Sequence, residues 1–171
     1  MNDYEYLHTL SKGIRHVITY GTTDEASIVG EATNDTSFLE VELKKGMTGS
    51  IATHLVGSYN LPNVLAAVAV GLFFKVPNEK IRNAIASYEP TNSRSQLIEW
   101  NNNKVILDAY NANPLSMKAA LETLSKCSSR KVAIIGDMRE LGEFSEHYHK
   151  EIGNLCKTLK LDLVLTYGHY M

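Results

Sequence analysis

The chain has 171 residues, with 17 Lys and Arg against 19 Asp and Glu, which gives a formal net charge of −2. Hydrophobic residues make up 44% and charged residues 21% of the sequence, so a disordered acidic tail is excluded. Without excess positive charge we expect no nucleic-acid partner. No apolar run approaches the ~18 residues of a membrane span, and no basic and apolar signal-peptide pattern opens the chain. Two distant cysteines without a CxxC spacing favour a cytoplasmic protein with neither a zinc site nor a disulfide framework.

The first half of the sequence predicts a small antiparallel meander followed by two helices. The run 37–43 alternates apolar and charged residues, which is typical of an antiparallel strand with one solvent-exposed face. Residues 64–74 are apolar on all sides, which predicts a buried helix, and Pro62 suits its first turn. The elements expected here are a helix at 2–12, strands at 16–20, 27–31, 37–43 and 50–56, and helices at 64–74 and 78–88.

After a linker at residues 89–93, the second half predicts a parallel α/β sheet of the strands 104–108, 131–136 and 161–167. The almost purely apolar run 131–136 indicates a strand covered on both faces. No helix follows the last strand, which favours a fragment, the alternative being a small sheet completed by dimerisation. The expected elements are a hairpin of strands 95–100 and 104–108 around an Asn-rich turn, helices at 114–127 and 145–159, and strands at 131–136 and 161–167.

Two polar features have side chains that suit a nucleotide. Asn60 and Asn63 lie three residues apart at a helix start, and a carboxamide matches the N6/N7 edge of adenine. The plain alternative is that Asn60 is an N-cap and Asn63 its neighbour. Arg94 follows the linker, and its guanidinium suits phosphate and developing negative charge. The plain alternative for Arg94 is an ordinary surface residue.

Two further segments follow strand ends, where open parallel sheets bind ligands. In Asp108-Ala109-Tyr110-Asn111-Ala112-Asn113 the carboxylate suits ribose hydroxyls, and Tyr110, Asn111 and Asn113 suit a polar backbone or a carboxylate. A capped turn is the alternative. Gly136 and Gly142 bracket a tight loop that suits either a ligand or a purely structural role.

Several chemistries are not expected from the remaining residues. His147 and His149 are two apart and face different sides of a helix, so they do not form a metal pair. No nucleophile–base pair is evident, and the sequence lacks a GxxxxGK[ST] phosphate loop.

The segments GSYNLPNVLAAVAVG, Arg94, DAYNANPLSM and GDMRELGEFSEHYH, in this order, resemble the C-terminal part of a Mur ligase. The resemblance is specific from Gly57 to His149 and rests mostly on pattern over residues 1–56. It implies an α/β chain. Antiparallel strands and helices in residues 1–90 would end the ATPase-type central domain, and residues 91–171 would form a truncated, Rossmann-like C-terminal domain.

The resemblance also implies roles for individual residues. Asn60 and Asn63 match the paired Asn at the adenine, Arg94 matches an arginine at the nucleotide with a catalytic role, and Asp108 matches the aspartate that holds the ribose hydroxyls. Tyr110, Asn111 and Asn113 match a loop facing the incoming dipeptide. No metal ligand is assigned in this chain, since the family's phosphate loop and Mg²⁺ ligands lie upstream.

The activity implied is that of the family member that adds D-alanyl-D-alanine to UDP-N-acetylmuramoyl-tripeptide in peptidoglycan synthesis. That enzyme uses ATP and Mg²⁺, passes through an acyl phosphate, and is expected to be a cytoplasmic monomer. Closure of its domains would bring Arg94 and Asp108 onto ATP. The chain alone is expected to be inactive. The alternatives are a non-catalytic nucleotide- or peptide-binding module of the same fold, and a related Mur or folylpolyglutamate ligase.

Overall fold

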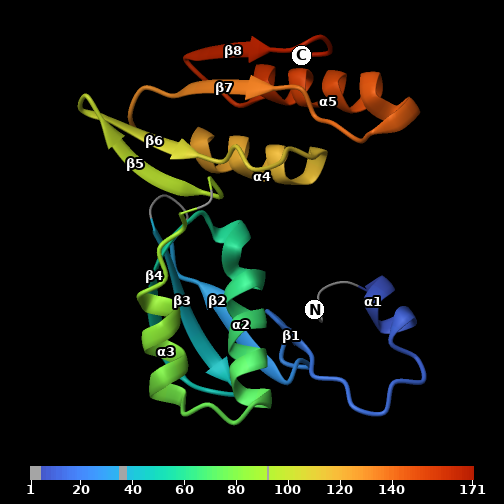
Figure 1. Cartoon of the computed structure of the whole chain (residues 1–171), viewed down its shortest axis with the longest axis vertical. Helices are drawn as coiled ribbons and strands as arrows, with labels where there is room; N and C mark the ends of the chain where they lie inside the picture. Colours follow the sequence, from blue (N-terminus) through green and yellow to red (C-terminus); the bar gives the residue numbers. More distant parts are fainter. Residues whose placement is uncertain (1–4, 35–37, 92) are drawn as a thin grey trace. The chain divides into compact units, whose positions relative to one another are not determined.

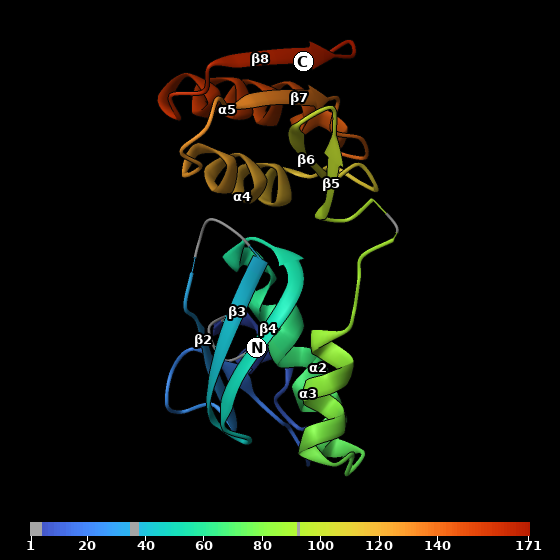
Figure 2. The same cartoon turned by 90° about the vertical axis from the view of Figure 1, so that its left-hand side faces the viewer.

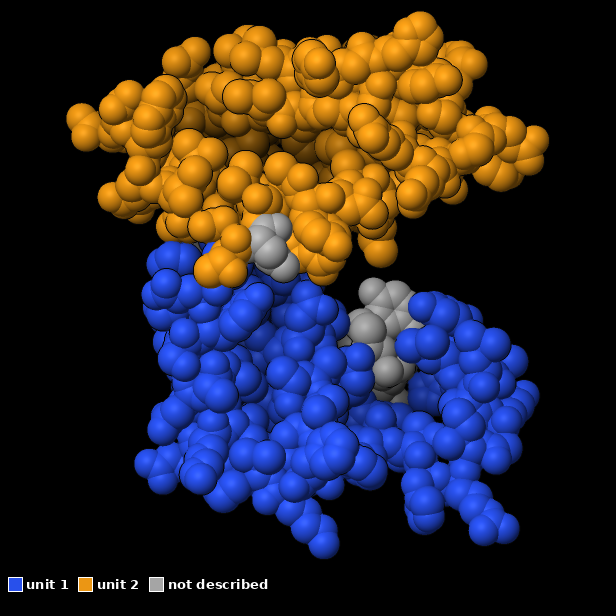
Figure 3. Space-filling model, viewed as in Figure 1, with its two compact units in different colours: residues 1–90 blue, residues 91–171 orange. Residues whose placement is uncertain are grey.

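The computed structural model describes residues 5–34, 38–91 and 93–171. The chain forms two compact units, residues 1–90 and 91–171 (Figure 3). Parts of three predicted segments lie outside the described residues, namely residues 2–4 of the first helix, residue 37 of the alternating strand and residue 92 of the linker.

Unit 1 is built on a four-stranded sheet in the order β1-β2-β3-β4 (Figure 1). The predicted meander is confirmed, because β2–β3 and β3–β4 pair antiparallel. The alternation in β3 buries Leu39, Val41 and Leu43 on one face. The strands are β1 (Tyr20–Gly21), β2 (Ile28–Ala32), β3 (Phe38–Lys45) and β4 (Gly49–Val56), and a short helix α1 (Glu5–Leu10) precedes them.

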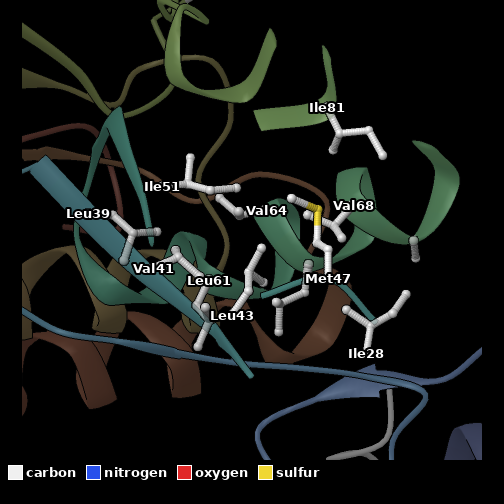
Figure 4. Close-up of a cluster of buried hydrophobic side chains, with 12 residues drawn as sticks. Ile28, Leu39, Val41, Leu43, Met47, Ile51, Leu61, Val64, Val68 and Ile81 are labelled. Atoms are coloured by element: carbon white, nitrogen blue, oxygen red, sulfur yellow. The ribbon is translucent and has the colours of Figure 1, made fainter. Parts of the chain in front are cut away.

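Two helices, α2 (Leu61–Phe73) and α3 (Asn78–Ala86), pack on one face of this sheet and enclose the core in Figure 4. Helix α2 buries residues at helical spacing, among them Leu61, Leu65 and Val68. Helix and sheet approach closely at Gly30, where a Cβ atom would lie 2.8 Å from the Leu65 side chain. A 3₁₀ turn, η1 (Ser58–Asn60), leads into α2.

Two predictions for unit 1 are wrong. The strand expected over residues 16–20 is reduced to β1, Tyr20–Gly21, which pairs parallel with β2. Helix α2 is not buried on all sides, because Val70 and Phe73 are exposed. A sheet covers only one side of a helix, so an apolar composition on the other side does not by itself bury it.

Unit 2 contains a hairpin and a two-stranded parallel sheet with helices (Figure 2). In the hairpin, Asn101 and Asn102 form the turn with φ angles of 46° and 62°, as their tolerance of positive φ predicts. A core formed by Leu121, Ile135 and Ile152 joins α4, β7 and α5. The elements are β5 (Gln96–Trp100), β6 (Asn103–Leu107), α4 (Pro114–Ser125), β7 (Val132–Gly136), η2 (Gly142–Phe144), α5 (Ser145–Thr158) and β8 (Leu163–Tyr167).

Strands β7 and β8 pair in parallel as predicted, but β6 does not join them. Among the described residues, β6 pairs with β5 alone, through the two-residue turn that joins them. The prediction that both faces of β7 are covered is also wrong. Ile134 is 76% exposed, since α4 and α5 pack against the face that carries Ala133 and Ile135.

The mixed α/β fold class is confirmed, with an antiparallel sheet in unit 1 and a parallel pair in unit 2. Within the described residues, none of the helices has both the length and the apolar character needed to cross a membrane.

Candidate functional site

Three predicted site residues gather at the base of the β5–β6 hairpin. The Cζ atom of Arg94 lies 3.9 Å from the centre of the Tyr110 ring, a cation–π contact. Beside it, the Ser95 backbone N–H donates to Oδ1 of Asp108 over 3.2 Å. The carbonyl of Ser93 accepts the backbone N–H groups of Ala109 and Tyr110, at 2.8 and 3.2 Å. We call Arg94, Ser95, Asp108 and Tyr110 the hairpin-base cluster.

The hairpin register explains this gathering. Gln96 pairs with Leu107, so the residues just before β5 lie opposite those just after β6. Ser93 and Ser95 have φ angles of 57° and 49°, a left-handed conformation that non-glycine residues seldom adopt. The backbone on either side of Arg94 is therefore held in an unusual shape, as is common at binding sites. The Arg94 side chain and the Asp108 carboxylate are exposed, so both are accessible to a ligand.

The other two residues of the predicted dipeptide loop contact their own segment. Asn111 Oδ1 accepts the backbone N–H of Ala112 over 2.9 Å. Asn113 caps α4: its Oδ1 accepts the Ser116 backbone N–H at 2.9 Å, and the Ser116 hydroxyl accepts the Asn113 backbone N–H at 3.2 Å. The capped-turn alternative thus holds for Asn113, and Tyr110 is the member of this loop that reaches the hairpin-base cluster.

Asn60 and Asn63 contact each other in unit 1. Asn63 Nδ2 donates to Asn60 Oδ1 over 3.0 Å, and Asn60 Nδ2 donates to the carbonyl of Val56 over 2.8 Å. Asn60 is buried, whereas Asn63 is exposed. Although Asn60 is the residue before α2, its side chain makes no capping hydrogen bond. It ties the end of β4 to the start of α2 and orients Asn63, which presents the accessible carboxamide.

The loop between Gly136 and Gly142 lines a surface cavity of about 650 Å³, together with Tyr167, Gly168 and Tyr170. The backbone N–H groups of His169, Tyr170 and Met171 donate to the Asp137 carboxylate, at 2.7, 3.0 and 3.0 Å. Of these, the His169 hydrogen bond contributes most to holding the pKa of the Asp137 carboxyl below its ordinary value. This arrangement was not predicted, because its donors are backbone groups with no residue-type signal.

The sequence of unit 2 matches one family. Residues 93–170 match the model of the "Mur ligase, glutamate ligase domain". The curated UDP-N-acetylmuramoyl-tripeptide–D-alanyl-D-alanine ligase of Bacillus subtilis is 35% identical over 127 residues, which are 72% of this chain and 28% of that protein. The chain belongs to the Mur ligase family.

Solved structures of Mur ligases have the same fold. A crystal structure of MurF from Acinetobacter baumannii aligns with 91% of this chain and 34% of its own, with a TM-score of 0.82 and 27% identity. The Thermotoga maritima MurF ligase, solved in complex with ADP, has a TM-score of 0.78 at 19% identity over 98% of this chain and 43% of its own, which establishes the fold alone. The chain thus spans about a quarter to two fifths of these Mur ligase relatives.

Proposed function

We propose that this chain belongs to a ligase that joins D-alanyl-D-alanine to UDP-N-acetylmuramoyl-tripeptide at the expense of ATP. Residues 1–90 would form the end of the ATPase-type central domain, and residues 91–171 would form much of the C-terminal domain. The observation that carries the proposal is the hairpin-base cluster. It brings an accessible guanidinium, an accessible carboxylate and a tyrosine together within the segment that matches the Mur ligase model.

In the reaction, the terminal carboxylate of the tripeptide attacks the γ-phosphorus of ATP, the bond to the bridging oxygen breaks, and ADP leaves. The amine of D-alanyl-D-alanine then attacks the acyl phosphate carbonyl, phosphate departs, and the amine loses a proton. Both steps need positioning and stabilisation of negative charge more than a covalent nucleophile. The lack of a nucleophile–base pair in the sequence suits this chemistry.

The residues of this chain would act chiefly on the nucleotide. Arg94 would stabilise charge on the transferred phosphoryl group, and its stacking on Tyr110 fixes the guanidinium plane. Asp108 is oriented through Oδ1 by the Ser95 N–H, and Oδ2 would accept a ribose hydroxyl. Asn63, oriented by the buried Asn60, would contact adenine.

Part of the site would lie outside these 171 residues. The sequence has no GxxxxGK[ST] loop, and in this proposal other segments of the enzyme would hold the phosphates. Among residues 5–34, 38–91 and 93–171 no group of three His, Cys, Asp or Glu side chains suits a metal ion. We place the Mg²⁺ ligands upstream of this chain, as the resemblance implies, and assign no step to the metal. We also propose that the full-length enzyme acts as a monomer in the cytoplasm.

A chimera tests the proposal. Residues 1–171 replace the matching segment of the Bacillus subtilis ligase, and ADP release is measured with both substrates and ATP. We expect release that depends on both substrates, and a loss of about 10²–10³-fold in kcat for Arg94→Ala. Arg130→Ala is the matched control, because Arg130 is an exposed arginine of the same unit and is not a member of the cluster.

Three results would contradict parts of this proposal. A folded chimera that binds ATP without forming the amide would favour the non-catalytic module. A chimera that prefers a single amino acid over the dipeptide would favour a related ligase. Release of ADP by the 171-residue chain alone, or submicromolar binding of ATP to it in isothermal titration, would show that the phosphate site lies within the chain.

A further inference from the structure

The cavity beside β7 and β8 is lined by the loop of residues 138–142. Within the 138–142 loop, Glu140 has a φ of 64° and Gly142 a φ of 56°. A left-handed glutamate costs about 1 kcal/mol or more, so this loop needs outside contacts to keep its shape. One contact comes from Leu141, which packs against the core of unit 2, and another from the start of the loop, where Met138 is buried.

The outside contact at Met138 is a histidine of α5. His149 is 3% exposed. Its Nδ1 lies 2.7 Å from the carbonyl oxygen of Ser145, and since a carbonyl only accepts, Nδ1 carries the proton. Nε2 is then an acceptor, and the backbone N–H of Met138 donates to it over 2.9 Å. The ring is thus a neutral bridge between the first turn of α5 and the first residue of the loop.

A second anchor acts on the opposite wall of the cavity. Asp137, which precedes Met138, accepts the three backbone N–H groups of residues 169–171. Gly168 permits this approach, because a Cβ atom there would lie 2.2 Å from the Asp137 carboxyl. The His149 ring also packs against Tyr170, with ring centres 5.5 Å apart. Both cavity walls therefore converge on the dipeptide Asp137-Met138.

We propose that His149 is a positioning residue that fixes the 138–142 loop, and so the cavity wall, through one hydrogen bond from the Met138 N–H. Nothing in the proposed chemistry uses His149, and its ring is too buried to touch a ligand directly. An effect of His149 on the ligase reaction rests on the proposed function, whereas the effect of its hydrogen bond on the position of the loop does not.

Two variants of similar size separate the hydrogen bond from packing. In His149→Gln the amide oxygen reaches the position of Nε2 and still accepts the Met138 N–H. In His149→Asn the side chain reaches only the position of Nδ1, so the bond to Ser145 survives and the bond from Met138 is lost. His147→Gln is the matched control, since His147 is an exposed histidine of the same helix.

The readouts on the 171-residue chain are imidazole ¹⁵N shifts and hydrogen exchange of the Met138 amide by NMR. We expect the Nδ1–H tautomer at neutral pH. We also expect about 10-fold faster exchange at Met138 in His149→Asn, as for loss of roughly 1.4 kcal/mol of protection, and near wild-type exchange in His149→Gln and His147→Gln. An Nε2–H tautomer, or equal exchange in the Gln and Asn variants, would overturn the proposal.

The chimera adds the catalytic readout. If the 138–142 loop borders the active site, its displacement in His149→Asn should lower kcat/KM by up to about 10²-fold, and His149→Gln should restore most of it. An inactive chimera with native His149 would count against the proposed function alone. An active chimera indifferent to His149→Asn, despite fast exchange at Met138, would show that the loop's position does not matter to the reaction.

Discussion

Replacement of Asp108 by Ala or by Asn separates two roles of one carboxylate. Asp108 Oδ1 accepts the backbone N–H of Ser95, a residue that is only 5% exposed. Asp108→Ala leaves the buried N–H of Ser95 without this acceptor, which should lower the free energy of unfolding by about 1 kcal/mol. Asn keeps an oxygen in the same place, and we expect its cost to stay below about 0.5 kcal/mol.

Urea unfolding of the 171-residue chain measures this difference. Far-UV circular dichroism is the readout, because the single tryptophan, Trp100, is already 67% exposed in the folded chain. With a denaturant slope of about 1 kcal/mol per molar urea, the midpoint should fall by about 1 M in Asp108→Ala and by less than half of that in Asp108→Asn.

The ribose role predicts that Asp108→Asn, although stable, loses activity. A hydrogen bond to a charged group is worth about 1.5–3 kcal/mol, so the Asn variant of the chimera should lose about 10–100-fold in kcat/KM for ATP while remaining stable. An unchanged urea midpoint in Asp108→Ala would refute the stabilising role of the Ser95 contact. Full activity in Asp108→Asn would refute the need for a charge there.

Three further substitutions test the packing and the electrostatics. Gly168→Ala should destabilise unit 2 by about 2 kcal/mol, because the new Cβ atom would lie 2.2 Å from the Asp137 carboxyl. Gly153→Ala, with open space around the new Cβ atom, should stabilise unit 2 slightly. Equal urea midpoints for the two variants would contradict this expectation. Leu65→Ala should lower the free energy of unfolding, followed by circular dichroism in urea, by about 2–5 kcal/mol. Replacement of the exposed Phe73 by Ala should lower it by less than about 1 kcal/mol. Since the folded pKa of Asp137 is lowered from 3.8, its ionised form stabilises the fold above that pH and the benefit disappears as pH falls through the folded pKa. The stability advantage of the wild type over Asp137→Asn should therefore shrink as pH falls below 3.8, and a constant difference in urea midpoint would exclude this account.

The parts of the fold that the sequence predicts well are those set by local chemistry. The alternation of β3 identifies its buried face, and the two asparagines of the β5–β6 turn suit the positive φ angles found there. The exposed Val70 and Ile134 could not be predicted, because a run of apolar residues gives no information about which neighbour covers it.

The contacts of the candidate site also differ in whether the sequence predicts them. The contact between Arg94 and Tyr110 follows from the predicted hairpin, whose register brings the two flanking segments together. The contact between His149 and Met138 does not, since its donor is a backbone N–H that any residue at position 138 except proline supplies. A lone histidine in a predicted helix therefore gave no sign of its partner.

The two aspartates that follow strands in unit 2 differ in how much of each carboxylate the protein itself uses. Asp137 accepts backbone N–H groups through both oxygens, Oδ2 from His169 and Oδ1 from Tyr170 and Met171. Asp108 accepts one through Oδ1, and Oδ2 accepts none from the described residues. A carboxylate oriented by one oxygen and open at the other suits ligand binding, while one satisfied at both suits structure. Asp108→Asn should therefore reduce activity before stability, and Asp137→Asn should reduce stability first.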